Sequence, residues 1–173
     1  MLPISRVTTF REGLDHPECV AVHPDGSVWA GGEAGQVYRI SPDGKRMKEV
    51  ANTGGFVLGI AFTPDARHLA ICDVKQACVF RMDLRTKRLA RFFRPRTPIS
   101  IPNHLADDRQ SRLYVTDSGA FRKVCGRIFR FEPDGKGAVW HPGPFNFANG
   151  IALAPDSSAV YVVCSWLPGV ERV

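Results

Sequence analysis

The sequence has little that favours helices and nothing that resembles a membrane span. No window of its 173 residues carries apolar residues at i, i+3, i+4 and i+7 over enough length for a good helix. No run approaches the roughly 18 apolar residues that cross a bilayer, and the first residues lack the apolar centre of a signal peptide. We therefore expect an all-β, cytoplasmic protein without a membrane partner.

Several chemical motifs are also missing. The five cysteines form an odd set without a C-x-x-C pair, which argues against a disulfide framework and a thiolate zinc site. Glycine-rich stretches at 31–35 and 54–59 fit neither a phosphate loop nor a dinucleotide fingerprint. Ser118 and Ser165 lack the G-x-S-x-G elbow of serine hydrolases. These absences disfavour nucleotide-dependent and serine-nucleophile chemistry.

The net charge of +6 comes from one short segment. Between Arg81 and Arg96 seven cations face a single acidic residue, Asp83, while the rest of the chain is balanced. Such a stripe is typical of an outermost strand whose cations prevent edge-to-edge pairing. The alternative is phosphate binding, although Phe92 and Phe93 are the only aromatic residues there that could stack on bases. We expect no nucleic-acid partner.

One turn motif recurs along the chain. Pro-Asp-Gly stands at 24–26, 42–44 and 133–135, with Pro-Asp-Ala at 64–66 and Pro-Asp-Ser at 155–157. Proline presets the first central φ, aspartate bonds back to the backbone, and glycine accepts a positive φ. Each motif therefore predicts a reversal between two strands.

Alignment on these turns gives a repeat with spacings of 40, 45 and 46 residues between Glu18, Leu58, Asn103 and Asn149. Each of these residues opens an apolar run that continues into a hairpin. A period of this length with four strands per unit is typical of β-propeller blades around a central channel. We expect a single β-propeller domain over residues 1–173, with blades starting near 18, 58, 103 and 149.

The length covers about three and a half blades, whereas a complete ring of this type would have about six. We therefore expect the chain to be C-terminally truncated relative to a closed ring, with an extra strand over residues 6–11. The apolar flanks of the first and fourth blades would be exposed, and self-association through them is a further expectation.

Residues at one register of successive blades point at the same level of the ring axis. Glu18 offers a carboxylate there, and Asn103 and Asn149 offer amide oxygens, a set that suits a hard cation such as Ca²⁺. Leu58, at the fourth equivalent position, cannot bind a metal. The structural alternative for each asparagine is that its side chain caps backbone groups at a turn-to-strand junction.

Four segments carry a family resemblance: His16-Pro17-Glu18, Pro102-Asn103, residues 147–151 and residues 165–172. They resemble the regucalcin, gluconolactonase and luciferin-regenerating-enzyme (SMP-30-like) family and related strictosidine-synthase-like six-bladed propellers, over nearly the whole chain. The resemblance implies that Glu18 and Asn149 hold a divalent metal, Ca²⁺ or Zn²⁺, and that Asn103 binds the metal or the substrate. It also implies a hydrolase that opens a small-molecule lactone, with the metal acting as a Lewis acid while water attacks.

The same resemblance makes Asp117 the predicted general base, with a turn-forming role at a strand end as the alternative. His16 and His104 are further candidates. His104 stands where many lactonases carry Asp, so substrate positioning beside Asn103 is expected to differ.

A further family ligand, an Asp of a later blade, would lie beyond residue 173, so we expect residues 1–173 alone to hydrolyse lactones poorly. Two alternatives stay open. One is a strictosidine-synthase-like propeller with other chemistry and no need for a metal, and the other is a binding propeller without catalysis.

Overall fold

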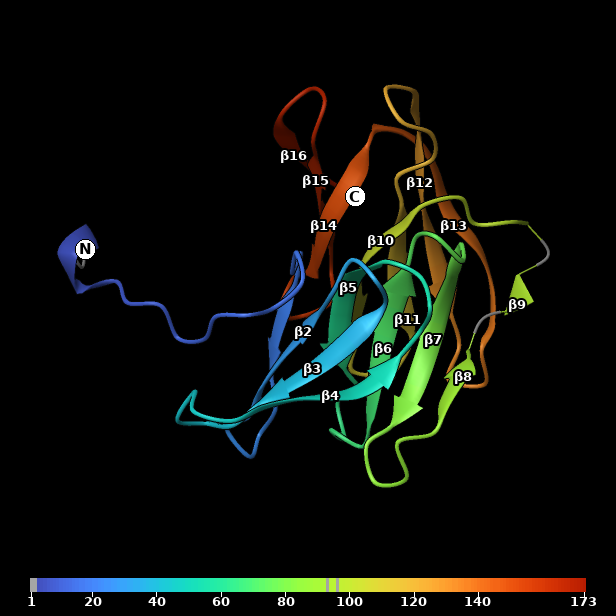
Figure 1. The fold of residues 1–173 in the computed structure, drawn as a ribbon. Helices are drawn as coiled ribbons and strands as arrows, with labels where there is room; N and C mark the ends of the chain where they lie inside the picture. Colours follow the sequence, from blue (N-terminus) through green and yellow to red (C-terminus); the bar gives the residue numbers. More distant parts are fainter. Residues whose placement is uncertain (1–2, 93, 96) are drawn as a thin grey trace.

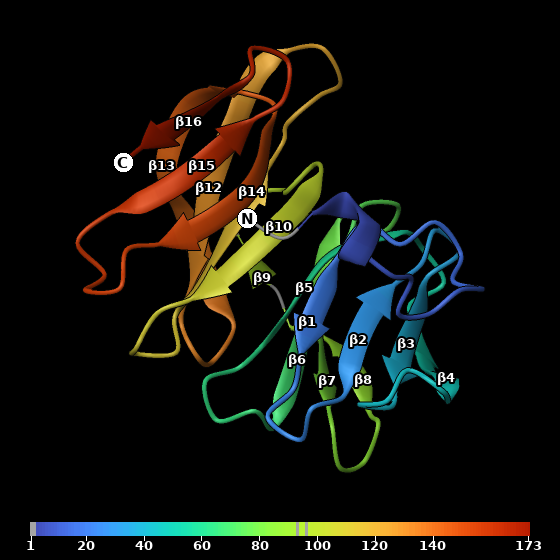
Figure 2. The same ribbon diagram turned by 90° about the vertical axis from the view of Figure 1, so that its left-hand side faces the viewer.

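The computed structural model describes residues 3–92, 94–95 and 97–173. It consists of four separate antiparallel sheets that follow one another along the chain, as the repeat predicts. Within each sheet the strands are in sequence order, apart from one short strand, β9 (Arg94–Pro95), at the edge of the third sheet, so each sheet is essentially a meander built from hairpins. Figures 1 and 2 show these sheets as the blades of a propeller. The all-β propeller expected from the sequence is confirmed.

The first two blades have four strands each. Blade 1 contains β1 (Val20–Val22), β2 (Val28–Gly31), β3 (Gln36–Ile40) and β4 (Met47–Asn52). Blade 2 contains β5 (Val57–Phe62), β6 (His68–Asp73), β7 (Cys78–Asp83) and β8 (Leu89–Arg91).

The other two blades differ from this pattern at their outer edges. Blade 3 contains β10 (Pro102–Asp107), β11 (Leu113–Asp117), β12 (Val124–Phe131) and β13 (Lys136–Asn146), with β9 (Arg94–Pro95) added in parallel beside β13. Blade 4 contains β14 (Ala148–Leu153), β15 (Val160–Cys164) and β16 (Gly169–Arg172). The first strands of the four blades begin within two residues of the positions aligned by the repeat.

The Pro-Asp turns close the hairpins in the way their chemistry predicts. Gly26, for example, has a φ of +81°, and Asp25 Oδ1 accepts a hydrogen bond from the backbone N–H of Ser27 at 2.8 Å. Asp156 bonds to Ser158 N in the same way at 3.0 Å. The aspartate therefore fixes the turn, and the turn fixes the register of the two strands that it joins.

Three hydrophobic clusters lie between successive blades and hold them face to face. Trp29 of blade 1 packs with Ile60 and Leu69 of blade 2, and the other two clusters join blades 2 and 3 and blades 3 and 4. The first strands β1, β5, β10 and β14 follow one another around the inner side of the blades, with β10 in contact with both β5 and β14 (Figure 2). Residues at equal positions of these strands therefore face a shared central region.

The outer flanks of blades 1 and 4 are exposed, as expected. On β1 the side chains of Val20 and Val22 are 68% and 65% exposed. On β15 burial alternates, and Val163 points away from blade 3.

The cationic segment lies only in part on an outermost strand: Arg91 is on β8, the edge strand of blade 2, whereas Arg81 is on β7 and the cations at 85, 87 and 88 lie in the turn between these strands. Phe93 and the side chains of residues 94–96 lie outside the described residues.

The expected strand over residues 6–11 is wrong. Ile4–Arg6 forms a short 3₁₀ helix, and no strand is assigned between residues 7 and 11. A strand exists through hydrogen bonds to a neighbouring strand, and this segment instead touches a turn of blade 1, where Arg11 Nη1 donates to Lys45 O at 3.2 Å.

All five cysteines are free, and the described residues contain no helix long and apolar enough to span a bilayer.

Candidate functional site

Equivalent irregularities occur in the first strands of blades 2, 3 and 4. In each, the pairing with the second strand shifts just after the first ladder pair, which leaves two residues outside the regular ladder. The shifts lie between Val57 and Ile60, between Pro102 and Leu105, and between Ala148 and Ile151. Such bulges redirect side chains. Leu58, Asn103 and Asn149 occupy the same place in these bulges, so the equivalence predicted from spacing is present in the structure.

Blade 1 follows the same register at Glu18. Val20 pairs with Ala30 as Ile60 pairs with Ile71 in blade 2. Glu18 therefore lies two residues before the Val20–Ala30 pair, as Leu58 lies two residues before the Ile60–Ile71 pair.

A second set of equivalent positions lies at the ends of the second strands. Ser118 N donates to Ile101 O at 2.9 Å, and Ser165 N donates to Phe147 O at 3.2 Å. In blade 2 the corresponding residue is Val74. Blades 3 and 4 thus place a serine beside the asparagine of the preceding strand.

The Asn103 side chain is buried and has a fixed orientation. Its Nδ2 donates to Ser118 Oγ at 3.0 Å, and Ser118 Oγ donates to Ala148 O at 2.6 Å. Because the single hydroxyl proton of Ser118 is used on Ala148, Ser118 can only accept from Asn103. The amide nitrogen therefore faces Ser118. Within the part of the chain that the structure describes, Asn103 Oδ1 accepts no hydrogen bond and is free to bind a ligand.

Asn149 repeats this arrangement one blade further on. Its Nδ2 donates to Ser165 Oγ at 3.0 Å, and its Oδ1 has no hydrogen-bond partner among the described residues. The Thr116 hydroxyl of β11 donates to the backbone carbonyl of Asn149 at 2.6 Å and ties blade 3 to blade 4. The structure thus brings the two asparagines to neighbouring first strands, each with an amide oxygen available.

Glu18 lies further around the ring, on blade 1, with a side chain that is 46% exposed. His16 bridges it to a second carboxylate, since its Nε2 lies 3.2 Å from Glu18 Oε1 and its Nδ1 lies 2.8 Å from Glu33 Oε2. The hydrogen bond and charge of Glu33, with a smaller effect from Glu18, raise the pKa of His16.

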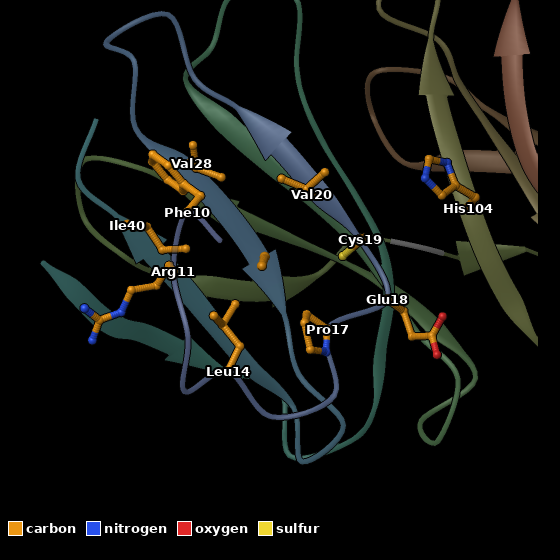
Figure 3. Close-up of a pocket in the computed structure, with 11 residues that line it drawn as sticks. Phe10, Arg11, Leu14, Pro17, Glu18, Cys19, Val20, Val28, Ile40 and His104 are labelled. Carbon is orange, nitrogen blue, oxygen red and sulfur yellow. The ribbon is translucent and has the colours of Figure 1, made fainter. Parts of the chain in front are cut away.

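Glu18 and His104 line the same pocket of about 570 Å³ although they belong to blades 1 and 3. The opposite wall of this pocket is apolar and includes Phe10 and Val28. In Figure 3 the Glu18 carboxylate points away from these apolar residues, toward the side on which His104 lies. The pocket therefore brings a carboxylate and an imidazole of the predicted site together.

The imidazole of His104 is largely buried, and burial lowers its pKa. Burial thus favours the uncharged form of the ring. Its Nδ1 is buried and has no hydrogen-bond partner among the described residues. A buried nitrogen without a hydrogen-bond partner destabilises the fold. A ligand that reached this atom and formed a hydrogen bond with it would remove that cost.

Asp117 is fully buried and surrounded by donors. Its carboxylate accepts hydrogen bonds from the backbone N–H groups of Ser100, Ile101 and Gly119, and Arg127 Nε donates to Oδ2 at 3.1 Å. These contacts tie the loop before β10 to the end of β11. They favour the structural alternative for Asp117 over the predicted general base.

The equivalent residue of blade 2 has the same type of contact. Asp73 ends β6 as Asp117 ends β11, and its Oδ1 accepts from Phe56 N at 3.2 Å and from Gln76 N at 2.9 Å. A carboxylate that recurs at this position and binds the incoming loop belongs to the blade architecture.

Sequence reasoning did not find the two serines that orient the asparagines. The signal was present, because Ser118 follows Asn103 by 15 residues and Ser165 follows Asn149 by 16. Alignment of the second strands would have placed both serines at one position. Among the described residues, no three His, Cys, Asp or Glu side chains gather to hold a metal, so the candidate site depends on the amide oxygens.

Comparisons with known proteins agree with this propeller. Residues 53–168 match the family model "SMP-30/Gluconolactonase/LRE-like region", and residues 6–40 match "Strictosidine synthase-like, N-terminal". The chain is 26% identical over 163 residues to the protein STRICTOSIDINE SYNTHASE-LIKE 6 of Arabidopsis thaliana. The alignment covers 84% of this chain and 44% of that protein.

Two solved structures are similar in fold. A gluconolactonase of Xanthomonas campestris gives a TM-score of 0.71 at 19% identity, over 88% of this chain and 55% of its own. A putative gluconolactonase gives a TM-score of 0.79 at 16% identity, over 94% of this chain and 60% of its own. The chain is thus a β-propeller of the gluconolactonase type in its fold.

It belongs to the SMP-30/gluconolactonase/LRE-like family, whose model covers two thirds of its length. The chain spans about half the length of the relatives that it matches.

Proposed function

We propose that this chain supplies the metal-binding and substrate-binding face of a lactone hydrolase. The observation that supports the proposal most strongly is the pair of serine-oriented asparagines, because Asn103 and Asn149 both keep an amide oxygen available on neighbouring strands. Family membership supports lactone hydrolysis as the reaction class.

The donor set fits a divalent cation of the hard type. Asn103 Oδ1, Asn149 Oδ1 and the Glu18 carboxylate are all oxygen donors, and together they carry a single negative charge. This favours Ca²⁺ over Zn²⁺, which prefers nitrogen and sulfur ligands. When bound, such a cation polarises a carbonyl oxygen and stabilises the negative charge that develops on it.

The residues of the chain would act around the lactone carbonyl. Water adds to the carbonyl carbon, the ring C–O bond breaks, and the product is an open-chain hydroxy acid. In this proposal Asn103 and His104 would contact the ring. A proton must leave the attacking water, and the contacts favour His104 over Asp117 as its acceptor. His104 Nδ1 has no partner in the described chain, whereas the Asp117 oxygens are held by backbone groups and Arg127.

The test is lactone hydrolysis by the chain with calcium and with a chelator. With γ-valerolactone and saturating Ca²⁺ we expect slow hydrolysis above the uncatalysed rate, because the chain spans about half of its relatives. EDTA should remove this activity, and Asn149→Ala should abolish it, while Ser158→Ala on an exposed turn of the same blade should not. An activity unchanged by EDTA, or no calcium-dependent activity at all, would contradict the proposal.

A second candidate rests on the similarity to the strictosidine synthase-like protein over 84% of the chain. In that case the propeller would carry out another reaction that needs no metal, and activity on a lactone would be absent. Calcium binding without lactone turnover would favour this candidate or a binding propeller.

A further inference from the structure

Three aromatic side chains form a cluster at the surface, which we call the aromatic cluster: the exposed Phe121 and Trp166 and the half-buried Phe147. Trp166 lies edge-to-face against Phe121 with ring centroids 5.0 Å apart, and it also packs against Phe147 at 5.5 Å. Phe121 is 62% exposed and Trp166 is 43% exposed. Large apolar side chains that gather on a surface mark a site of interaction, whereas single exposed ones need no explanation.

The aromatic cluster lies next to the Asn–Ser pairs. Trp166 directly follows Ser165, which holds Asn149, and Phe121 follows Ser118, which holds Asn103, by three residues. Phe147 stands two residues before Asn149. The loop after β11 and the turn after β15 extend at the same end of the molecule in both views (Figures 1 and 2).

The aromatic cluster is held in place before any ligand binds. Phe147 has a φ of +61°, a left-handed conformation that is unfavourable for a bulky residue. It is fixed there because its carbonyl accepts from Ser165 N at 3.2 Å and its N–H donates to Phe145 O at 3.0 Å. The Arg122 guanidinium lies over the Phe121 ring, with its Cζ atom 5.5 Å from the ring centroid. Strain of this kind at a surface position is typical of binding sites, and a preformed wall loses little entropy on binding.

We propose that the aromatic cluster binds an apolar alkyl or aryl substituent of a lactone whose ring lies at Asn103 and Asn149. This inference rests on the proposed function and names its substrate class. Small-molecule sites combine an apolar wall with a few placed polar groups, and the aromatic cluster and the Asn–Ser pairs supply these two parts. A polyhydroxylated lactone would place hydroxyl groups against the rings without hydrogen-bond partners, so the site favours apolar substituents.

The test measures binding of γ-lactams, which keep the ring carbonyl but resist hydrolysis. We would titrate the chain with 5-methyl-, 5-butyl- and 5-octyl-2-pyrrolidinone by calorimetry, with Ca²⁺ and with EDTA. Affinity should rise on the order of tenfold from methyl to octyl, as expected for partial burial of the added methylenes. Phe121→Ala and Trp166→Ala should each remove most of this rise. Tyr161→Ala, an exposed aromatic on the outer flank of the same blade, should keep it.

The outcomes separate this inference from the proposed function. Lactam affinity that does not depend on chain length, or the same dependence in Phe121→Ala as in the original chain, would overturn the inference even if calcium binds. An absence of calcium binding would overturn the proposed function, and the chain-length comparison in EDTA would still decide the role of the aromatic cluster.

Discussion

Asn103 Nδ2 donates a hydrogen bond to Ser118 Oγ at 3.0 Å, and the Ser118 hydroxyl donates one to the backbone carbonyl of Ala148 in the next blade. The carbonyl oxygen of Asn103 is thereby turned away from the serine and left available. Asn149 and Ser165 repeat the contact at the same distance. Blades 3 and 4 thus orient an asparagine through the same hydrogen bond to a serine, and each leaves an amide oxygen available. The candidate metal site is built on this repeated contact.

The serines should therefore control metal affinity without binding the metal. Ser118→Ala and Ser165→Ala remove the acceptor that orients each amide, and we expect each to weaken Ca²⁺ binding about tenfold, as for other groups that orient ligands. Calorimetric titration measures this. Ser158→Ala, on an exposed turn, is the control and should bind as the original chain does. Equal affinity in all four proteins would show that amide orientation is irrelevant.

Blade 2 offers the reverse experiment. Leu58 and Val74 stand where blades 3 and 4 have Asn and Ser. The double substitution Leu58→Asn and Val74→Ser should build a further oriented amide and strengthen Ca²⁺ binding about tenfold, because each added oxygen ligand raises affinity. Leu58→Asn alone lacks the orienting serine and should give a smaller gain. A double variant that binds no better than the single one would contradict the role assigned to the serine.

Asp117 should matter for stability. Asp117→Asn removes the charge that pairs with Arg127 and some of the acceptor capacity used by Ser100, Ile101 and Gly119. We expect a loss of about 3 kcal/mol in the free energy of unfolding, measured by urea denaturation. Asp73→Asn should cost less, since Asp73 Oδ2 has no hydrogen-bond partner among the described residues. An Asp117→Asn protein of full stability that lacks hydrolysis would instead identify Asp117 as the general base.

Asp107 should make the fold less stable at pH 8 than at pH 5. Burial, and then the charge of Asp108, raise its pKa to about 7, and its Oδ2 is buried without a partner among the described residues. Between its ordinary pKa of about 4 and this value the folded chain binds more protons than the unfolded one, so stability falls as the pH rises. Asp107→Asn should remove this loss.

The effect of Asp107 is measurable as a difference between two pH values. Denaturation of both proteins at pH 5 and pH 8 should show the variant gaining about 1 to 2 kcal/mol relative to the original chain at the higher pH. If the free energies of unfolding of the two proteins differed by the same amount at pH 5 and pH 8, a raised pKa of Asp107 would be excluded.

Much of the fold was predictable because local chemistry determines it. The Pro-Asp turns fix the hairpins through side-chain contacts within two residues, such as Asp25 to Ser27, and these contacts can be read from the sequence. The spacing of the turns then gives the blades. The strand expected over residues 6–11 could not be tested from the sequence in this way, because a strand depends on a partner elsewhere in the fold.

The site was predictable only in part. Equal register placed Asn103 and Asn149 correctly at one position of neighbouring strands, because propeller symmetry converts sequence spacing into location. The surroundings of Asp117 could not be predicted, since its donors come from a preceding loop and from β12 and meet only in the folded blade. The shared pocket of Glu18 and His104 also depends on how blades 1 and 3 are placed by blade 2.

The central claim is that equal positions of successive blades bind one cation together. Calorimetric titration of the chain with Ca²⁺ tests it most directly, with the double variant Asn103→Ala and Asn149→Ala beside the control Leu58→Ala at the equivalent position of blade 2. We predict saturable binding near one ion per chain in the original protein and in Leu58→Ala, and a loss of about a hundredfold or more in affinity in the double variant. Equal calcium binding by the double variant and the original chain would contradict the account.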